Sequence, residues 1–255
     1  IVQGLTEFLP ISSSGHLVLV PYAFDWSDQG LAFDVAVHFG SLLAVLLFFR
    51  NDIKALLRGG VQVLGGSVST VESRLALGIA LGTIPAAVAG LLLAGWIEAN
   101  LRSPNVIVFT LAFYAVLMLM ADRFGKRVRE ISGMRIKDAF LIGCAQALAL
   151  VPGTSRSGVT ITAAMALGFE RQDAARFSFI LAVPVILLAS VYEFIGLLRA
   201  PEAVAWAQLG VAALVSAVVA YLSIEFFMRF VTRIGLMPFA AYRLILAGVI
   251  VYIVA

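Results

Sequence analysis

The stretch "EFLPISSSGH", residues 7–16, places a glutamate, three serines and a histidine between two hydrophobic runs. Pro10 lies inside it, and proline removes a backbone donor and stops or kinks a helix. A second stretch, "PGTSRSG" at residues 152–158, interrupts another apolar region in the same way and adds an arginine. Neither half of either region, 1–24 or 137–168, is long enough to cross a bilayer. Each region therefore predicts a re-entrant helix–loop–helix hairpin with a polar tip.

The composition predicts an integral membrane protein. Of the 255 residues 62% are hydrophobic and only 13% are charged, whereas a soluble domain has about a quarter charged residues. The apolar runs are continuous rather than alternating, which indicates an all-α polytopic protein and not a β-barrel. The net charge of +3 indicates no nucleic-acid partner. Six runs fall within the roughly 17 to 25 residues that a spanning helix needs: 33–49, 75–97, 104–122, 177–198, 206–230 and 239–255.

The order of these segments predicts a single membrane domain, over 1–255, built from two related halves. A hairpin and three spans are followed by a second hairpin and three more spans, and an offset near 142–144 aligns Pro10 with Pro152 and Ser13 with Ser155. Each half has an odd number of crossings, so the second half should be inverted relative to the first. The expected boundaries are repeat 1 at about 1–122, a cytoplasmic loop at about 123–136 and repeat 2 at about 137–255.

The basic residues predict the orientation of the chain. If the loops at 50–74 and 123–137 are cytoplasmic, then 14 of the 18 Lys and Arg residues lie on that side. The first hairpin then enters from outside and the second from the cytoplasm, with their tips near mid-membrane. Arg243, a turn inside the last span, is expected to snorkel to the interface. The chain begins at Ile1 inside an expected element, so an N-terminal segment is expected to precede it.

The first tip carries the residue types of a hydrolytic centre. Gln3 and Glu7 are four residues apart and share a helix face, as do Ser13 and His16 after the proline. Glu7, Ser13 and His16 together supply an acid/base, a hydroxyl nucleophile and an imidazole.

Both tips also predict phosphate binding. Ser12 or Ser13 should cap the helix after the first break, and Thr154 or Ser155 the helix after the second. Two helix N-termini at one depth favour an anion, and the Arg156 guanidinium suits phosphate oxygens. A charge inside the membrane is costly unless paired, so Glu7 and Arg156 need either each other or a ligand. The predicted phosphate-binding residues are Gln3, Ser12, Gly153, Thr154, Ser155, Ser157 and Thr160.

Two long motifs resemble a known family. "QGLTEFLPISSSGH" and "PGTSRSGVT" are similar to the two signatures of the undecaprenyl-diphosphate phosphatases, the bacitracin-resistance family, and the likeness extends through "HFGSLLAVLLFF" to "PFAAYR". The resemblance implies removal of the terminal phosphate from a C55 isoprenyl diphosphate in the bacterial inner membrane, which regenerates the lipid carrier for peptidoglycan synthesis. It also implies an inverted-repeat fold with two re-entrant hairpins, a pocket open to the outer leaflet and dependence on Mg2+ or Ca2+.

The resemblance also implies residue roles. Ser13 is the expected nucleophile, with Glu7 and His16 as acid/base and orienting groups and Arg156 as the phosphate clamp. Glu7 is the expected metal ligand, since position 3 is Gln where many members have Glu. His16 stays open as an alternative nucleophile.

The competing function is a flippase or transporter of an anionic isoprenyl lipid, because inverted repeats and broken helices serve transporters too. Against it stands the grouping of a nucleophile with a base, which anion binding alone does not need. The expected partners are the polyprenyl diphosphate substrate and membrane lipids, with a homodimer left open.

Overall fold

The computed structural model describes residues 1–13, 15–16, 30–198 and 206–254, and this part of the chain is helical with no β-strand. Part of the expected first hairpin therefore lies outside the described residues. The long helices are α3 (Leu31–Phe48), α4 (Arg50–Leu64), α5 (Val71–Asn100), α6 (Pro104–Phe124), α9 (Arg171–Leu198), α10 (Trp206–Ile234) and α11 (Met237–Val254). The short elements are α1 (Val2–Thr6), α7 (Ile136–Ala147), α8 (Arg156–Ala166) and the 3-10 turns η1 (Ile131–Gly133) and η2 (Leu148–Leu150).

The helices confirm a multi-pass membrane protein. Five of those described (α5, α6, α9, α10 and α11) are long and apolar enough to span a bilayer, and α3 with α4 makes a sixth if that bent pair is one span. Large apolar side chains on these helices remain exposed, among them Leu91 at 79%, Phe109 at 64% and Leu214 at 66%. In water such surfaces would be a liability, whereas in a bilayer they face lipid.

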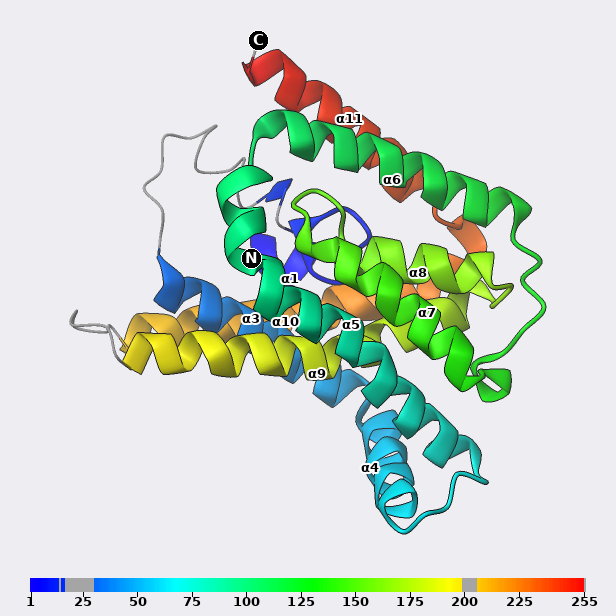
Figure 1. Cartoon of the computed structure of the whole chain (residues 1–255). Helices are drawn as coiled ribbons and strands as arrows, with labels where there is room; N and C mark the ends of the chain where they lie inside the picture. Colours follow the sequence, from blue (N-terminus) through cyan, green and yellow to red (C-terminus); the bar gives the residue numbers. More distant parts are fainter. Residues whose placement is uncertain (14, 17–29, 199–205, 255) are drawn as a thin grey trace.

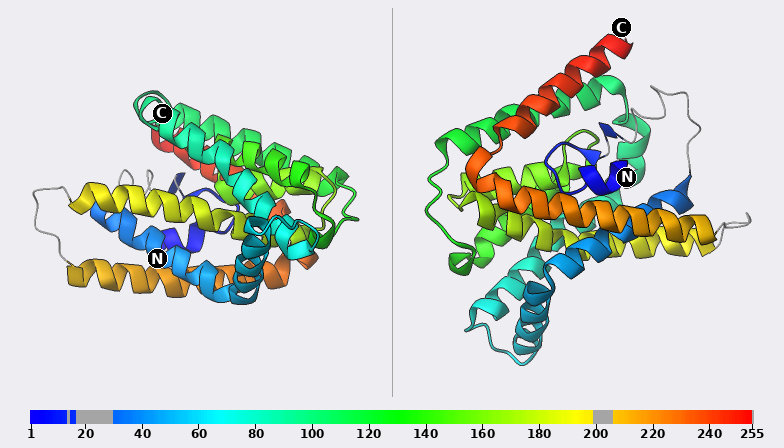
Figure 2. Two further views of the ribbon diagram at one scale, coloured as in Figure 1. Left: turned by 60° about the horizontal axis from the view of Figure 1, so that its bottom comes forward. Right: turned by 180° about the vertical axis from the view of Figure 1, so that it is seen from behind.

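The helices form two groups with the short elements between them. Figure 1 shows α3, α9 and α10 lying together, and α6 paired with α11 on the opposite side. Between these groups lie α1, α7, α8 and the loops that follow α1 and η2, an arrangement that the rear view in Figure 2 repeats. The polar loops are therefore held inside the helix assembly.

Small residues let α5 and α7 approach closely. A Cβ added to Gly143 would lie 2.1 Å from the carbonyl oxygen of Gly82, which is closer than any real contact. Such backbone-to-backbone packing is how membrane helices associate where lipid removes the hydrophobic driving force. This packing fixes the position of α7, and therefore the start of the loop that leads from α7 and η2 to α8.

The expected loop at 50–74 is wrong over its first part, because Arg50–Leu64 forms α4. The chain turns by 85° between α3 and α4 at Phe49. The backbone of α4 packs closely on the start of α5: a Cβ on Gly59 would lie 2.2 Å from the Glu72 carbonyl oxygen. This contact between segments stabilises a helix where the sequence predicted a loop.

Candidate active site

The first loop presents a buried carboxylate at the end of α1. Glu7 is 8% exposed, and its Oε2 accepts hydrogen bonds from Gln3 Nε2 at 2.9 Å and from Ser13 Oγ at 3.1 Å. The helical spacing predicted the Gln3–Glu7 pair, and the turn at Pro10 brings Ser13 back to the same carboxylate. A serine hydroxyl that donates to a carboxylate has the arrangement of a nucleophile with its base.

The second loop runs from η2 to α8 and has a tight backbone. Gly153 has φ of 85°, and a Cβ there would lie 2.2 Å from Thr110 Oγ1, so only glycine fits. The same Thr110 hydroxyl donates to the Pro152 carbonyl at 2.7 Å. Ser155 then caps α8, accepting a hydrogen bond from the Gly158 N–H at 3.2 Å. The N–H groups of Arg156 and Ser157, at the start of α8, precede the first carbonyl of the helix that could accept from them.

The two loops share one local conformation. Ser12 has φ of 77° and Ser155 has φ of 70°, a region that non-glycine residues rarely occupy. Ser12 Oγ accepts from the Gly15 N–H at 3.3 Å, as Ser155 Oγ does from the Gly158 N–H. Of the caps left open by the sequence, the structure selects Ser12 and Ser155, and it matches Ser155 with Ser12 rather than with Ser13.

The loops meet through an ion pair and a hydrogen bond. Arg156 NH2 lies 2.8 Å from Glu7 Oε1, with side-chain exposures of 12% and 8%. Beside them, Ser157 Oγ donates to the Leu9 carbonyl at 3.1 Å. Two buried atoms at this junction have no hydrogen-bond partner among the described residues, Arg156 NH1 and Gln3 Oε1. A free donor on a buried guanidinium is a binding point for an oxyanion.

His16 lies at the edge of this centre and is tied to other groups. Its Nδ1 lies 2.7 Å from the Ser12 carbonyl oxygen, and since a carbonyl only accepts, Nδ1 carries the proton. Its Nε2 lies 2.7 Å from the Tyr242 hydroxyl of α11, and the two rings stack with centroids 5.6 Å apart. Both ring nitrogens are thus engaged by partners other than Ser13.

The profile of the family described as "Bacitracin resistance protein BacA" matches residues 1–249. This chain belongs to the BacA family. The undecaprenyl-diphosphatase of Hahella chejuensis is 52% identical over 254 residues, which is 99% of this chain and 95% of that protein. The undecaprenyl-diphosphatase of Chromohalobacter salexigens is 50% identical over 255 residues, 100% of this chain and 96% of that protein. That of Thioalkalivibrio sulfidiphilus is 49% identical over 254 residues, covering 99% and 96%.

Two other predicted phosphate-binding residues of this BacA-family chain, Thr154 and Thr160, contact neighbouring helices. Thr154 is fully buried, and its carbonyl faces α11. Thr160 lies one turn into α8, where its hydroxyl donates to the Arg156 carbonyl at 2.8 Å and contacts Ser178 Oγ at 2.6 Å. These contacts connect the start of α8 to α9.

Sequence reasoning missed two residues of α11. Tyr242 received no role, although it contacts His16. Arg243 was expected to snorkel, and this is wrong: the side chain is 0% exposed and donates to four backbone carbonyls. The sequence did contain a signal for a role of Arg243, namely an arginine inside an apolar span. Such a charge is costly in a membrane unless other groups of the protein compensate it.

The donor set at the junction suits a hard divalent cation. Glu7 supplies carboxylate oxygens and Gln3 Oε1 an amide oxygen with no other partner among the described residues. Oxygen ligands of this kind suit Mg2+ or Ca2+. Across the described ranges no group of three His, Cys, Asp or Glu residues gathers for a metal, so phosphate oxygens and water would have to complete the coordination.

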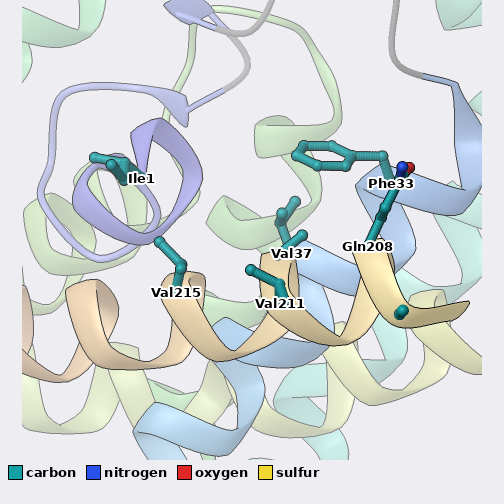
Figure 3. Close-up of a pocket in the computed structure, with 8 residues that line it drawn as sticks. Ile1, Phe33, Val37, Gln208, Val211 and Val215 are labelled. Atoms are coloured by element: carbon teal, nitrogen blue, oxygen red, sulfur yellow. The ribbon is translucent and has the colours of Figure 1, made fainter.

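A separate apolar pocket of about 500 Å3 lies between α1, α3 and α10 (Figure 3). Its lining is apolar except for one amide, and it contains none of the predicted polar site residues. It is lined by Ile1, Phe33, Val37, Ala207, Gln208, Val211, Ala212 and Val215.

Proposed function

We propose that this chain is an undecaprenyl-diphosphatase that hydrolyses undecaprenyl diphosphate to undecaprenyl phosphate and inorganic phosphate. The observation that carries the proposal is the shared carboxylate of Glu7, which accepts from Ser13 Oγ and pairs with Arg156 in a chain of the BacA family. The product regenerates the lipid carrier for peptidoglycan synthesis, and bacitracin resistance agrees with the family description.

Ser13 attacks the terminal phosphorus while Glu7 removes its hydroxyl proton over the existing 3.1 Å contact. The bond to the bridging oxygen breaks, and undecaprenyl phosphate leaves with that oxygen. Arg156 NH1 and the first N–H groups of α8 stabilise the charge on the transferring group. Glu7 releases the proton taken from Ser13 to solvent and then takes a proton from the attacking water. The P–Oγ bond breaks, inorganic phosphate leaves, and Glu7 returns a proton to Ser13 Oγ.

The geometry favours Ser13 over His16 as the nucleophile. Attack by His16 would need a free ring nitrogen. Its Nδ1 is hydrogen-bonded to the Ser12 carbonyl, and its Nε2 is hydrogen-bonded to the Tyr242 hydroxyl. His16 instead orients the first loop from its edge.

A divalent cation, Mg2+ or Ca2+, belongs to the same proposal. Glu7 and the Gln3 amide oxygen would hold it, and it would neutralise part of the diphosphate charge when bound. The unpartnered Gln3 oxygen supports this assignment.

The finer architecture is proposed as two inverted halves, 1–122 and 137–255, each with a re-entrant hairpin and three spans. The matching conformations of Ser12 and Ser155 support it. So does the order of the long helices, since α5, α6 and the bent pair α3–α4 belong to the first half and α9, α10 and α11 to the second. The active-site pocket is proposed to open on the outer face of the cytoplasmic membrane, as the resemblance to the bacitracin-resistance family implies. The bias of Lys and Arg indicates the orientation of the chain. A homodimer remains part of the proposal.

The test is phosphate release from C55 isoprenyl diphosphate in detergent with Mg2+ or Ca2+. We expect Ser13→Ala, Glu7→Ala and Arg156→Ala to lower turnover at least about a hundredfold, with His16→Ala less affected. The matched control is Ser132→Ala, an exposed serine in η1 that should keep parent activity. Labelled phosphate trapped on the parent and lost in Ser13→Ala would identify the phosphoserine. A parent that binds the lipid but releases no phosphate would refute the proposal and favour the flippase.

A further inference from the structure

Arg243 is a buried cation held by two separate parts of the backbone. Its Nε donates to the Leu111 carbonyl at 3.2 Å and its NH2 to the Thr110 carbonyl at 3.3 Å, both on α6. The guanidinium also donates to the second loop, from NH1 to the Thr154 carbonyl at 3.0 Å and from NH2 to the Gly153 carbonyl at 3.0 Å. One side chain of α11 thus joins α6 to the loop that precedes α8.

None of the ion pairs among the described residues includes Arg243. A charge in a membrane span costs several kcal/mol unless other groups compensate it. Here four backbone carbonyls compensate the charge of Arg243. A helix that only had to cross the bilayer would place an apolar residue there. The planar guanidinium of arginine has five N–H donors and can reach four carbonyls on two segments. A lysine ammonium has only three donors and cannot.

The held carbonyls set the direction of the peptides that lead into the site. The C=O and N–H of a trans peptide point in opposite directions, so fixing the Thr154 carbonyl also fixes the Ser155 N–H at the start of α8. Arg156 is the next residue. The guanidinium also lies against the first turn of α8, since a Cβ on Gly158 would be 3.2 Å from Arg243 NH1.

Tyr242, which precedes Arg243 on α11, contacts the first loop through His16. The Tyr242 hydroxyl lies 2.7 Å from His16 Nε2, and the two rings are stacked with an interplanar angle of 7°. Consecutive residues of α11 therefore reach one loop each, Tyr242 the first and Arg243 the second.

We propose that Tyr242 and Arg243 are positioning residues that hold the two loops at the separation at which Glu7 and Arg156 meet. This inference rests on the proposed function for its catalytic consequence, while its structural consequence can be measured separately.

The experiment compares Arg243→Met, Arg243→Lys and Tyr242→Phe with two controls, Arg233→Lys on α10 and Tyr252→Phe on α11. Both control side chains are exposed, Tyr252 at 86%. The readouts are amide hydrogen exchange in detergent, and kcat and KM with C55 isoprenyl diphosphate.

We expect Arg243→Met to speed exchange at least about tenfold in the 152–158 peptide alone. Its kcat should fall about a hundredfold, the effect of a misplaced catalytic group, with KM changed less than about threefold. Arg243→Lys should recover part of both losses. Tyr242→Phe keeps the stacked ring, so its faster exchange should be confined to the peptide that contains His16.

Unchanged exchange at 152–158 in Arg243→Met would overturn the proposal. So would faster exchange throughout the protein, because that shows a general loss of stability, and the Lys variant decides the question if the Met variant does not fold. A parent without phosphatase activity would refute the proposed function, while the exchange comparison would still decide the positioning role.

Discussion

Breaking the Glu7–Arg156 pair should cost several kcal/mol of stability, and removing both charges should cost about 2–3 kcal/mol less than the sum of the two single changes. Glu7→Gln keeps the size of the side chain but leaves Arg156 without its counter-charge. At a charge separation of about 4 Å and an effective dielectric constant of about 20, the attraction is about 4 kcal/mol. Solvent screens it little, since the two side chains are 12% and 8% exposed.

Each single change, Glu7→Gln or Arg156→Gln, should therefore lower the free energy of unfolding by about 3–5 kcal/mol, because it leaves an unpaired buried charge. The double variant leaves none. The coupling energy from the cycle should be about 2–3 kcal/mol. The measurement is the free energy of unfolding in a denaturing-detergent titration of all four proteins.

The matched control is the cycle for Glu225 and Arg229, an i,i+4 pair on α10 whose side chains are 34% and 71% exposed. Its coupling should be about 0.5 kcal/mol or less. If the Glu7–Arg156 coupling is as small as that of the control, the two loops are not joined by this pair, and the geometry on which the phosphatase mechanism depends is refuted.

Three further changes test other parts of the structure. Gly153→Ala should lower kcat at least about tenfold and reduce the thermal midpoint, because the new Cβ cannot fit at positive φ; normal kcat would contradict the tight loop. Gly143→Leu should destabilise the protein by about 3 kcal/mol or more in the same detergent titration, since it must push α7 away from Gly82 on α5, whereas an unchanged midpoint would show that this packing is not needed. Burial would raise the pKa of Asp138, but hydrogen bonds from Arg129 and a backbone N–H outweigh it and lower that pKa below 3.8. Asp138 therefore stabilises the fold above pH 3.8, and this contribution is lost as pH falls through the lowered value, so the stability difference between the parent and Asp138→Asn should shrink below pH 3.8; a constant difference would refute the assignment.

Some of this protein follows from local properties of the chain. Spanning helices need long apolar runs, and the described helices α5, α6, α9, α10 and α11 appear where such runs predicted them. Proline removes a backbone donor and can end a helix, which made the breaks at Pro10 and Pro152 predictable, although α5 and α9 continue through Pro85 and Pro184. The cost of an unpaired charge in a membrane predicted that Glu7 and Arg156 need either each other or a ligand, and the structure pairs them with each other.

Other features depend on contacts between distant residues. The sequence allowed Ser12 or Ser13 as the cap after the first break, and the packed loop selects Ser12. Helix α4 forms where the sequence predicted a loop, because its backbone packs on α5.

The last span shows this difference most clearly. A single arginine in an apolar run has two solutions, to extend to the interface or to satisfy its donors inside the protein. The sequence alone determined that Arg243 carries a charge into the membrane. Only the tertiary structure decided that its partners are carbonyls of α6 and of the second loop, 89 to 133 residues away along the chain. Hydropathy and spacing describe neighbours in the sequence, whereas these hydrogen bonds exist only once α6, α8 and α11 have packed together.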